Sequence, residues 1–334
     1  METKVTGKPS TLLVVIAFAA VYVVWGSTYF FIQMALHGIP PMIMGAIRFI
    51  AAGILLLSWC YLKGDRIFDK ATIKASGISG LLTLFVATGI VIWVEKFIPS
   101  AMVAIMVSAN PIWFVVLDRA NWKVNLKSRS TIWGLIIGFG GVVLLFGEAF
   151  SKSIAGGLDT KHLVGLLLLI VGPIAWSVGS LYSKKTATGA PARVNTSWQM
   201  LVAGIAFIPV GFIDNEYATF HISAVPLQAW MAVLYLIFFG SIAAFSAYVW
   251  LLQVRPATQV STHSYVNPVI AVLLGVLFAG EIISWLQIIG LVIILLSVLL
   301  VNLSKYSFGK PKVVKVDEPL PIKGEPVLPG KLCA

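Results

Sequence analysis

Long apolar segments limit what this chain can fold into more than any other feature of its sequence. Ten of them lie at residues 12–36, 41–62, 73–94, 99–118, 129–148, 162–184, 194–213, 226–252, 257–280 and 284–303. Each is close to the roughly 20 residues with which a helix crosses a bilayer. The segments are continuous apolar runs without the alternation of a membrane strand, and charged residues are only 11% of the chain. The predicted fold class is therefore an all-α polytopic membrane protein with ten transmembrane helices.

The positions of the basic residues predict the orientation of these helices. Lys and Arg number 24 against 13 Asp and Glu, an excess that would also suit nucleic-acid binding. If the N-terminus lies inside, however, the loops of the opposite side carry only Lys96, Lys152 and Lys161. The cytoplasmic loops then carry Lys63, Arg66, Lys70, Lys74, Arg119, Lys123, Lys127, Arg129, Lys184, Lys185, Arg193 and Arg255. This positive-inside bias predicts cytoplasmic N- and C-termini and no nucleic-acid partner.

The cysteines and histidines give no sign of a disulfide, a metal site or a cofactor. Cys60 and Cys333 both fall on the predicted cytoplasmic side, where disulfides are rare. The four histidines are scattered without the spacing of zinc ligands. The expected partners are a small-molecule substrate and the lipid bilayer.

The second half of the chain repeats the first. The set Trp93, Pro99, Val103, Asn110, Pro111 and Leu117 recurs, shifted by 157 residues, as Trp250, Pro256, Val260, Asn267, Pro268 and Leu274. Gly26, Ser27 and Tyr29 recur as Gly179, Ser180 and Tyr182, and Ala52-Gly53 recurs as Ala203-Gly204. Because five helices is an odd number, the second repeat would enter the membrane from the other side. The chain is thus predicted to hold two inverted five-helix repeats, at residues 12–150 and 160–304, around a central cavity of an alternating-access carrier. Residues 1–11 would be a cytoplasmic N-terminus and residues 305–334 a disordered cytoplasmic tail.

Several motifs resemble the EamA family of the drug/metabolite transporter superfamily. They are Val24-Trp25-Gly26-Ser27-Thr28-Tyr29, Arg48-Phe49, Tyr265-Val266-Asn267-Pro268-Val269 and Gly280-Glu281. The resemblance covers residues 10 to about 305 and implies a ten-helix basket whose cavity is lined mainly by helices 1, 3, 4, 6, 8 and 9. It further implies a monomeric permease of the bacterial inner membrane, often an exporter of amino acids or other small metabolites. One departure is that Lys123-Val124 occupies the position in the first half that matches Gly280-Glu281.

Two Asn-Pro pairs interrupt otherwise apolar spans. Pro111 and Pro268 are expected inside helices, where each would free a carbonyl, of Val107 and Ser264, and set a bend. Their predicted role is that of hinges in gating. Asn110 and Asn267 could bond the freed carbonyls or hold substrate, although packing alone would also explain the prolines.

Polar and aromatic residues in the middle of spans predict the lining of a site. The ninth helix has one polar face, which includes His263 and Asn267, and such a face turns toward the bundle interior. His263 could couple a proton to substrate movement, but the favoured interpretation is a neutral histidine hydrogen-bonded to a neighbouring helix. Aromatic walls with a few amides and hydroxyls suit largely neutral ligands. The predicted substrate-binding residues are Trp25, Ser27, Tyr29, Trp93, Asn110, Trp176, Tyr182, His263, Tyr265 and Asn267.

Charged residues near the site are few. Arg48 lies inside the second helix, where a structural hydrogen-bonding role is favoured over contact with an anionic substrate. Glu281, at an outer span end, is a second candidate for a structural or coupling role. The first and sixth helices carry no carboxylate in mid-membrane, which argues against export of cationic drugs coupled to protons.

These features favour an exporter of small neutral or zwitterionic metabolites, with amino acids as the leading substrates. A drug or sugar-derivative transporter on the same scaffold is the alternative. A structural or receptor role remains a further alternative. An intramembrane enzyme would need a nucleophile beside a base, for example Ser27 or Ser180 with His263. The serines occupy small-residue repeat positions, so no enzyme is predicted.

Overall fold

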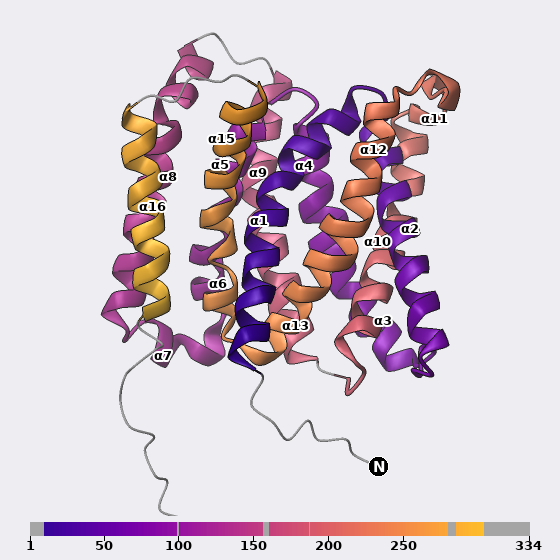
Figure 1. Ribbon diagram of the computed structural model, residues 1–334, viewed down its shortest axis with the longest axis horizontal. Helices are drawn as coiled ribbons and strands as arrows, with labels where there is room; N and C mark the ends of the chain where they lie inside the picture. Colours follow the sequence, from indigo (N-terminus) through magenta and orange to yellow (C-terminus); the bar gives the residue numbers. More distant parts are fainter. Residues whose placement is uncertain (1–9, 99, 156–159, 187, 280–284, 304–334) are drawn as a thin grey trace, which may run out of the picture.

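A computed structural model describes residues 10–98, 100–155, 160–186, 188–279 and 285–303, and these residues form helices and loops without a β-strand. All regular secondary structure in the described residues is therefore helical, as the apolar runs predicted. The helices stand side by side, and α1 begins at the same end of the molecule at which α16 ends (Figure 1).

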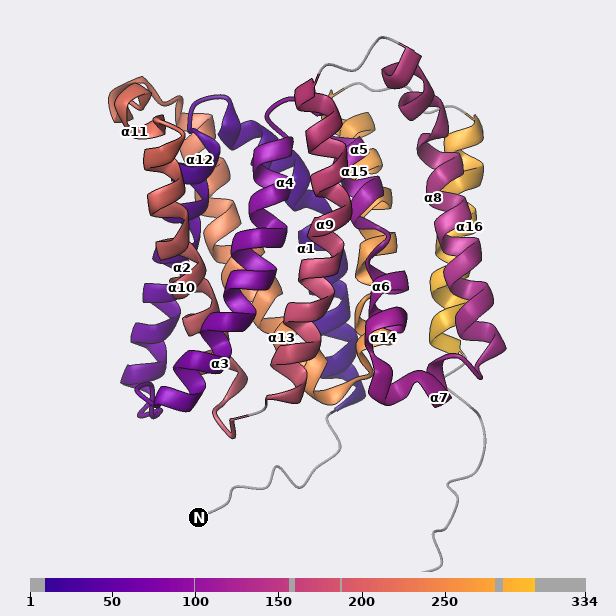
Figure 2. The same ribbon diagram turned by 180° about the vertical axis from the view of Figure 1, so that it is seen from behind.

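Six helices of the described residues are long and apolar enough to cross a membrane. They are α1 (Thr11–Leu36), α2 (Pro41–Leu62), the unit Lys70–Val94, α9 (Thr160–Lys185), α10 (Ala192–Ile213) and the unit Leu227–Val254. Their bounds agree with the predicted segments to within a few residues. Two further long helices, α8 (Arg129–Ala155) and α16 (Trp285–Leu303), pack against each other at one side of the bundle (Figure 2).

Each of the two segments that carry Asn-Pro is divided into two helices. Residues 99–118 were expected as one helix, but α5 (Ser100–Val107) ends before α6 (Asn110–Leu117) begins. Likewise α14 (Ala257–Val260) is separated by a turn from α15 (His263–Ala279). Short helices η2 (Arg119–Asn121), α7 (Trp122–Asn125), α11 (Glu216–Thr219) and η3 (Ile222–Ala224) lie in connections.

The two uninterrupted units 70–94 and 227–254 each contain a π-helical stretch. The first unit runs through α3 (Lys70–Gly80), η1 (Leu81–Ala87) and α4 (Thr88–Val94). The second runs through α12 (Leu227–Tyr235), η4 (Leu236–Phe245) and α13 (Ser246–Val254). π-Helical turns are rare and occur often at functional sites. Here η1 packs on α9 and η4 packs on α1, so both face the centre of the bundle.

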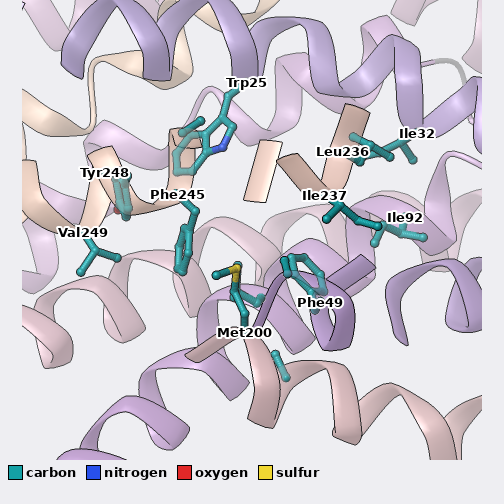
Figure 3. Packing of buried hydrophobic residues seen from close by; sticks show 14 of the residues in the cluster. Trp25, Ile32, Phe49, Ile92, Met200, Leu236, Ile237, Phe245, Tyr248 and Val249 are labelled. Atoms are coloured by element: carbon teal, nitrogen blue, oxygen red, sulfur yellow. The ribbon is translucent and has the colours of Figure 1, made fainter. Parts of the chain in front are cut away.

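Helices α2 and α10 cross in direct backbone contact. A Cβ atom added to Gly53 would lie 2.8 Å from the backbone nitrogen of Leu201, and one added to Gly204 would lie 2.6 Å from that of Ile50. Small residues permit such close approach between membrane helices, where packing rather than the hydrophobic effect holds the helices together. Phe49 of α2 and Met200 of α10 lie near this crossing, in the largest apolar cluster (Figure 3).

An acidic residue lies at each end of this helix pair. Pro40, the N-cap of α2, has no polar side chain, and the backbone N–H groups of Met42 and Ile43 instead donate to Glu216 Oε2, at 2.9 and 3.0 Å. A carboxylate is well placed there, since it accepts from free N–H groups at the positive end of the helix. At the other end, Arg193 donates through Nε and Nη2 to the carboxylate of Asp65, at 2.5 and 2.6 Å. The connections after α2 and after α10 are thus each attached to the opposite helix.

Candidate functional site

A cavity of about 80 Å³ lies where the central helices meet. This is several times the volume that one water molecule needs. Its walls come from α1, the unit 70–94, α5 and α6, α9, η4 and α15, which correspond to the six helices implied by the family resemblance. Helix α2 contributes as well, through Arg48 and Phe49. The remaining lining residues are Trp25, Thr28, Tyr29, Ile32, Leu84, Ala87, Thr88, Ile90, Val91, Val107, Asn110, Leu169, Gly172, Pro173, Trp176, Gly240, Ser241, Phe245, His263 and Asn267.

Trp25 is the centre of the aromatic part of the lining. Its indole Nε1 donates to the carbonyl oxygen of Gly240 at 3.0 Å, so the ring is held against the π-helical stretch η4. Edge-to-face contacts join it to Trp176, at 5.3 Å between ring centroids, and to His263, at 4.9 Å. Such geometries are the favoured ones for aromatic pairs, and they fix the orientation of the ring.

Tyr248 of α13 forms hydrogen bonds and ring contacts with this aromatic cluster. Trp176 Nε1 donates to the Tyr248 hydroxyl at 2.8 Å, and this hydroxyl also pairs with Ser180 Oγ at 2.7 Å. The Tyr248 ring lies 4.9 Å from that of Trp25 and 5.5 Å from that of His263. Figure 3 shows Tyr248 and Trp25 on facing elements. Sequence reasoning missed Tyr248, because a tyrosine in an apolar helix gives no signal of the direction in which it points.

Besides Arg48, three buried polar side chains of the lining have an atom without a hydrogen-bond partner among the described residues. These atoms are Asn110 Oδ1, His263 Nε2 and Asn267 Oδ1, on side chains that are 2–3% exposed. Two neighbouring polar atoms are engaged: Asn110 Nδ2 donates to Ser264 Oγ at 3.2 Å, and His263 Nδ1 lies 3.4 Å from Ser264 Oγ. A buried polar atom left unpaired costs about 1–3 kcal/mol. Atoms of this kind in a cavity wall are therefore suited to receive a polar ligand.

Arg48 is the only charged side chain among the described lining residues, if His263 is taken as neutral. It is 5% exposed, its Nε donates to Ser241 Oγ at 2.9 Å, and its guanidinium lies 4.8 Å from the centroid of the Phe49 ring. Ser241 was not predicted as a site residue, although the Gly240-Ser241 pair within an apolar run is a sequence signal that could have found it.

Four predicted substrate-binding residues lie outside the cavity lining. Ser27 Oγ donates to the carbonyl of Val24 or pairs with the Tyr235 hydroxyl of α12, both at 2.7 Å. The Tyr265 hydroxyl donates to the carbonyl of Leu135 on α8 at 3.2 Å. Trp93 packs on the ring of Phe97, at 4.9 Å. The fourth is Tyr182, on α9.

The two predicted hinge residues, Pro111 and Pro268, also lie apart from the lining, whereas Arg48, a predicted structural or coupling residue, belongs to it. The expectation that Pro111 sits inside a helix is wrong, because the residue is in the first turn of α6, where its missing N–H has no partner to lose. Pro268 does lie inside α15. Glu281 falls outside the described residues.

The described residues hold no group of three or more His, Cys, Asp and Glu side chains that could bind a metal. The imagined nucleophiles Ser27 and Ser180 pair with tyrosine hydroxyls rather than with His263. The lining is equipped for binding by aromatic faces, amide oxygens and one guanidinium.

Apolar helices of membrane-spanning length around a central cavity with unpaired polar side-chain atoms are the arrangement expected of a membrane transporter. The model of the EamA-like transporter family matches residues 12–147 and 163–303, and the chain belongs to this family.

Known relatives agree with this membership. YedA of Escherichia coli K12, described as an uncharacterized inner membrane transporter, is 36% identical over 305 residues, which are 90% of this chain and 94% of YedA. A Salmonella typhimurium LT2 protein described as a probable amino-acid metabolite efflux pump is 22% identical, over 82% of this chain and 90% of its own. A crystal structure of a protein with 18% sequence identity superposes with a TM-score of 0.69, over 87% of this chain and 98% of that chain, and shows the same fold. The resemblance drawn from the motifs is confirmed, and the protein is an integral inner-membrane transporter.

Proposed function

We propose that this protein is a carrier that exports small neutral or zwitterionic metabolites, with amino acids as the leading substrates. The observation that carries the proposal is the central cavity, in which aromatic rings and unpaired amide oxygens face the same small space. Aromatic walls with a few polar groups suit ligands that are partly apolar and carry little net charge. The Salmonella relative, described as a probable amino-acid metabolite efflux pump, supports both the substrate class and the direction.

The mechanism we propose is alternating access of two inverted five-helix repeats, at residues 12–150 and 160–304. Support comes from positions that correspond at a shift of 151 residues. Gly53 and Gly204 correspond in this way, and each meets the backbone of the other helix at the α2–α10 crossing. Asp65 and Glu216 correspond as well, and each is attached to the helix of the other repeat.

The π-helical stretches η1 and η4 occupy matching places in the two repeats, and both border the cavity. In this arrangement the six long apolar helices are joined by α5–α6, α8, α14–α15 and α16 to give ten spans. Both termini lie in the cytoplasm, and a single chain forms the working unit. The breaks near Pro111 and before Pro268 divide the helices that would move between the two access states.

A drug or sugar-derivative carrier is the second candidate, because an aromatic lining also suits such ligands.

The test is flux in proteoliposomes that contain the purified protein, with a panel of labelled amino acids, sugars and lipophilic drugs, each with and without a pH gradient. Saturable flux of amino acids is expected. Replacement of Asn267 by Ala should reduce this flux, whereas the matched variant Asn195→Ala, outside the cavity lining, should leave it unchanged. Flux of drugs or sugars alone would replace the proposed substrate class. Absence of any flux would contradict the carrier.

A further inference from the structure

We propose that Arg48 binds the carboxylate of the transported molecule, so that the cavity selects carboxylates, with or without an amino group, against amines that lack one. This inference rests on the proposed transport function. It assigns to Arg48 the substrate contact that the sequence alone ranked below a structural role.

The geometry of Arg48 leaves one side of its guanidinium open. Nε is engaged by Ser241 Oγ at 2.9 Å, and Nη2 lies against the backbone of Gly240, where an added Cβ would approach it to 3.1 Å. Nη1 has no hydrogen-bond partner among the described residues. The side chain is therefore held by η4 along one edge and presents free N–H donors along the other. Arg48 is itself one of the residues that line the cavity.

The charge of Arg48 has no ion-pair partner among the described residues. Glu95, which ends α4 and is 5% exposed, acts on it electrostatically, but the two groups form no ion pair within 4.0 Å. Both carboxylate oxygens of Glu95 are themselves without hydrogen-bond partners among the described residues. A buried cation without an anionic contact is unfavourable. Nη1 is left without a partner, and an anionic ligand would complete the site.

The rest of the lining fits the other parts of such a ligand. Asn110 Oδ1 and Asn267 Oδ1 can accept from an ammonium or hydroxyl group, and they belong to α6 and α15, not to the helix of Arg48. The rings of Trp25 and Trp176 can cover an apolar side chain. A planar guanidinium binds a carboxylate more strongly than a neutral donor does, because the hydrogen bonds are charge-assisted.

The experiment is ligand binding to the purified full-length protein in detergent, measured as thermal stabilisation. The common amino acids are screened first. For the strongest binder, the amino acid is then compared with its decarboxylated amine and with the carboxylic acid that lacks the amino group. Both carboxylates are expected to stabilise the protein, and the amine is not.

The variant Arg48→Gln should weaken carboxylate binding by about tenfold to a hundredfold, the loss expected for charge-assisted hydrogen bonds. Arg48→Lys keeps the charge but loses the planar guanidinium, so its affinity for carboxylates should lie between those of the wild-type protein and Arg48→Gln. Arg193→Gln is the matched control, because that arginine pairs with Asp65 away from the cavity. If Arg48→Gln does not fold, Arg48→Lys and the wild-type ligand series still decide the question.

The inference is overturned if the amine binds as well as the acids, if no carboxylate binds, or if Arg48→Gln keeps wild-type affinity. These binding results can be distinguished from a failure of the proposed transport function. A protein that binds carboxylates in detergent but moves nothing in proteoliposomes would retain the anion site and refute transport. A protein that carries amines and acids alike would retain transport and refute the anion site.

Discussion

Close contact of α10 with α2 and α3 can be tested with a graded series of glycine-to-alanine substitutions. A Cβ added at Gly204 would lie 2.6 Å from a backbone nitrogen and one at Gly53 would lie 2.8 Å from another, 0.8 and 0.6 Å short of the 3.4 Å of ordinary contact. A Cβ at Gly80 would meet the carbonyl oxygen of Gln199 more closely still. A Cβ at Gly77 would lie 3.5 Å from Val202 and fits without movement. The expected order of destabilisation is therefore Gly80, Gly204, Gly53, Gly77.

The magnitude follows from two opposing effects. Overpacking against a backbone costs about 1–3 kcal/mol, whereas Ala is favoured over Gly in a helix by roughly 1 kcal/mol. We expect a net loss of about 2 kcal/mol for Gly80→Ala, about 0–1 kcal/mol for Gly204→Ala and Gly53→Ala, and a slight gain for Gly77→Ala. A loss of 1 kcal/mol corresponds to roughly 2–4 °C in Tm for proteins somewhat smaller than this one.

Thermal unfolding can be followed with a thiol-reactive dye in a Cys333→Ser background. Cys60 is then the only thiol of the chain, and because it is buried, it reacts only on unfolding. Equal losses of Tm at Gly77 and Gly80, or a reversed order in the series, would refute the account of this contact. The carrier proposal would not be affected by the order alone.

Two further predictions concern the aromatic cluster and the end of α2. Tyr248→Phe removes the acceptor of Trp176 Nε1 and leaves a partly buried donor unpaired, at a cost of up to about 1–3 kcal/mol. The variant should raise KM in the flux assay, and an unchanged KM would mean that this bond does not position the ring. Burial raises the pKa of Glu216 above its ordinary value of 4.5, so the folded protein favours the protonated carboxyl. Part of the free energy of unfolding is therefore lost as the pH rises from 4.5 through the raised pKa. Glu216→Gln should therefore flatten the fall of Tm with pH in this interval, and a variant with the wild-type slope would contradict the assignment.

Helix positions could be predicted closely because the bilayer demands apolar runs of fixed length. The predicted segment 41–62 coincides with α2, and 194–213 differs from α10 by two residues. The division of 99–118 into α5 and α6 could not be read from apolarity, because the residues on both sides of the break are equally apolar. The π-helical stretch Leu81–Ala87 is likewise apolar apart from Thr83, and its altered backbone pairing depends on packing against other helices.

Residues of the cavity could be predicted where a polar group lies in mid-span, because such a group must turn away from lipid. Asn110, His263 and Asn267 were selected on this ground, and all three lie in the lining, although their role in substrate binding stays a prediction. Ser27 was selected by its position in the repeat, which does not fix the side toward which a side chain points, and it faces α12. Arg48 was placed outside the lining by family resemblance, and only the structure brings it to the cavity.

The central claim is that one cavity opens in turn to each side of the membrane. The most direct test is labelling of Thr88→Cys, in the lining, by a membrane-impermeant maleimide in right-side-out and inside-out vesicles, with Cys60 and Cys333 replaced by Ser. Ser177→Cys, buried outside the lining, is the control. The account predicts that Thr88→Cys is labelled from both sides, that substrate slows both reactions, and that Ser177→Cys is not labelled. Labelling from one side only, or labelling that substrate does not slow from either side, would contradict it.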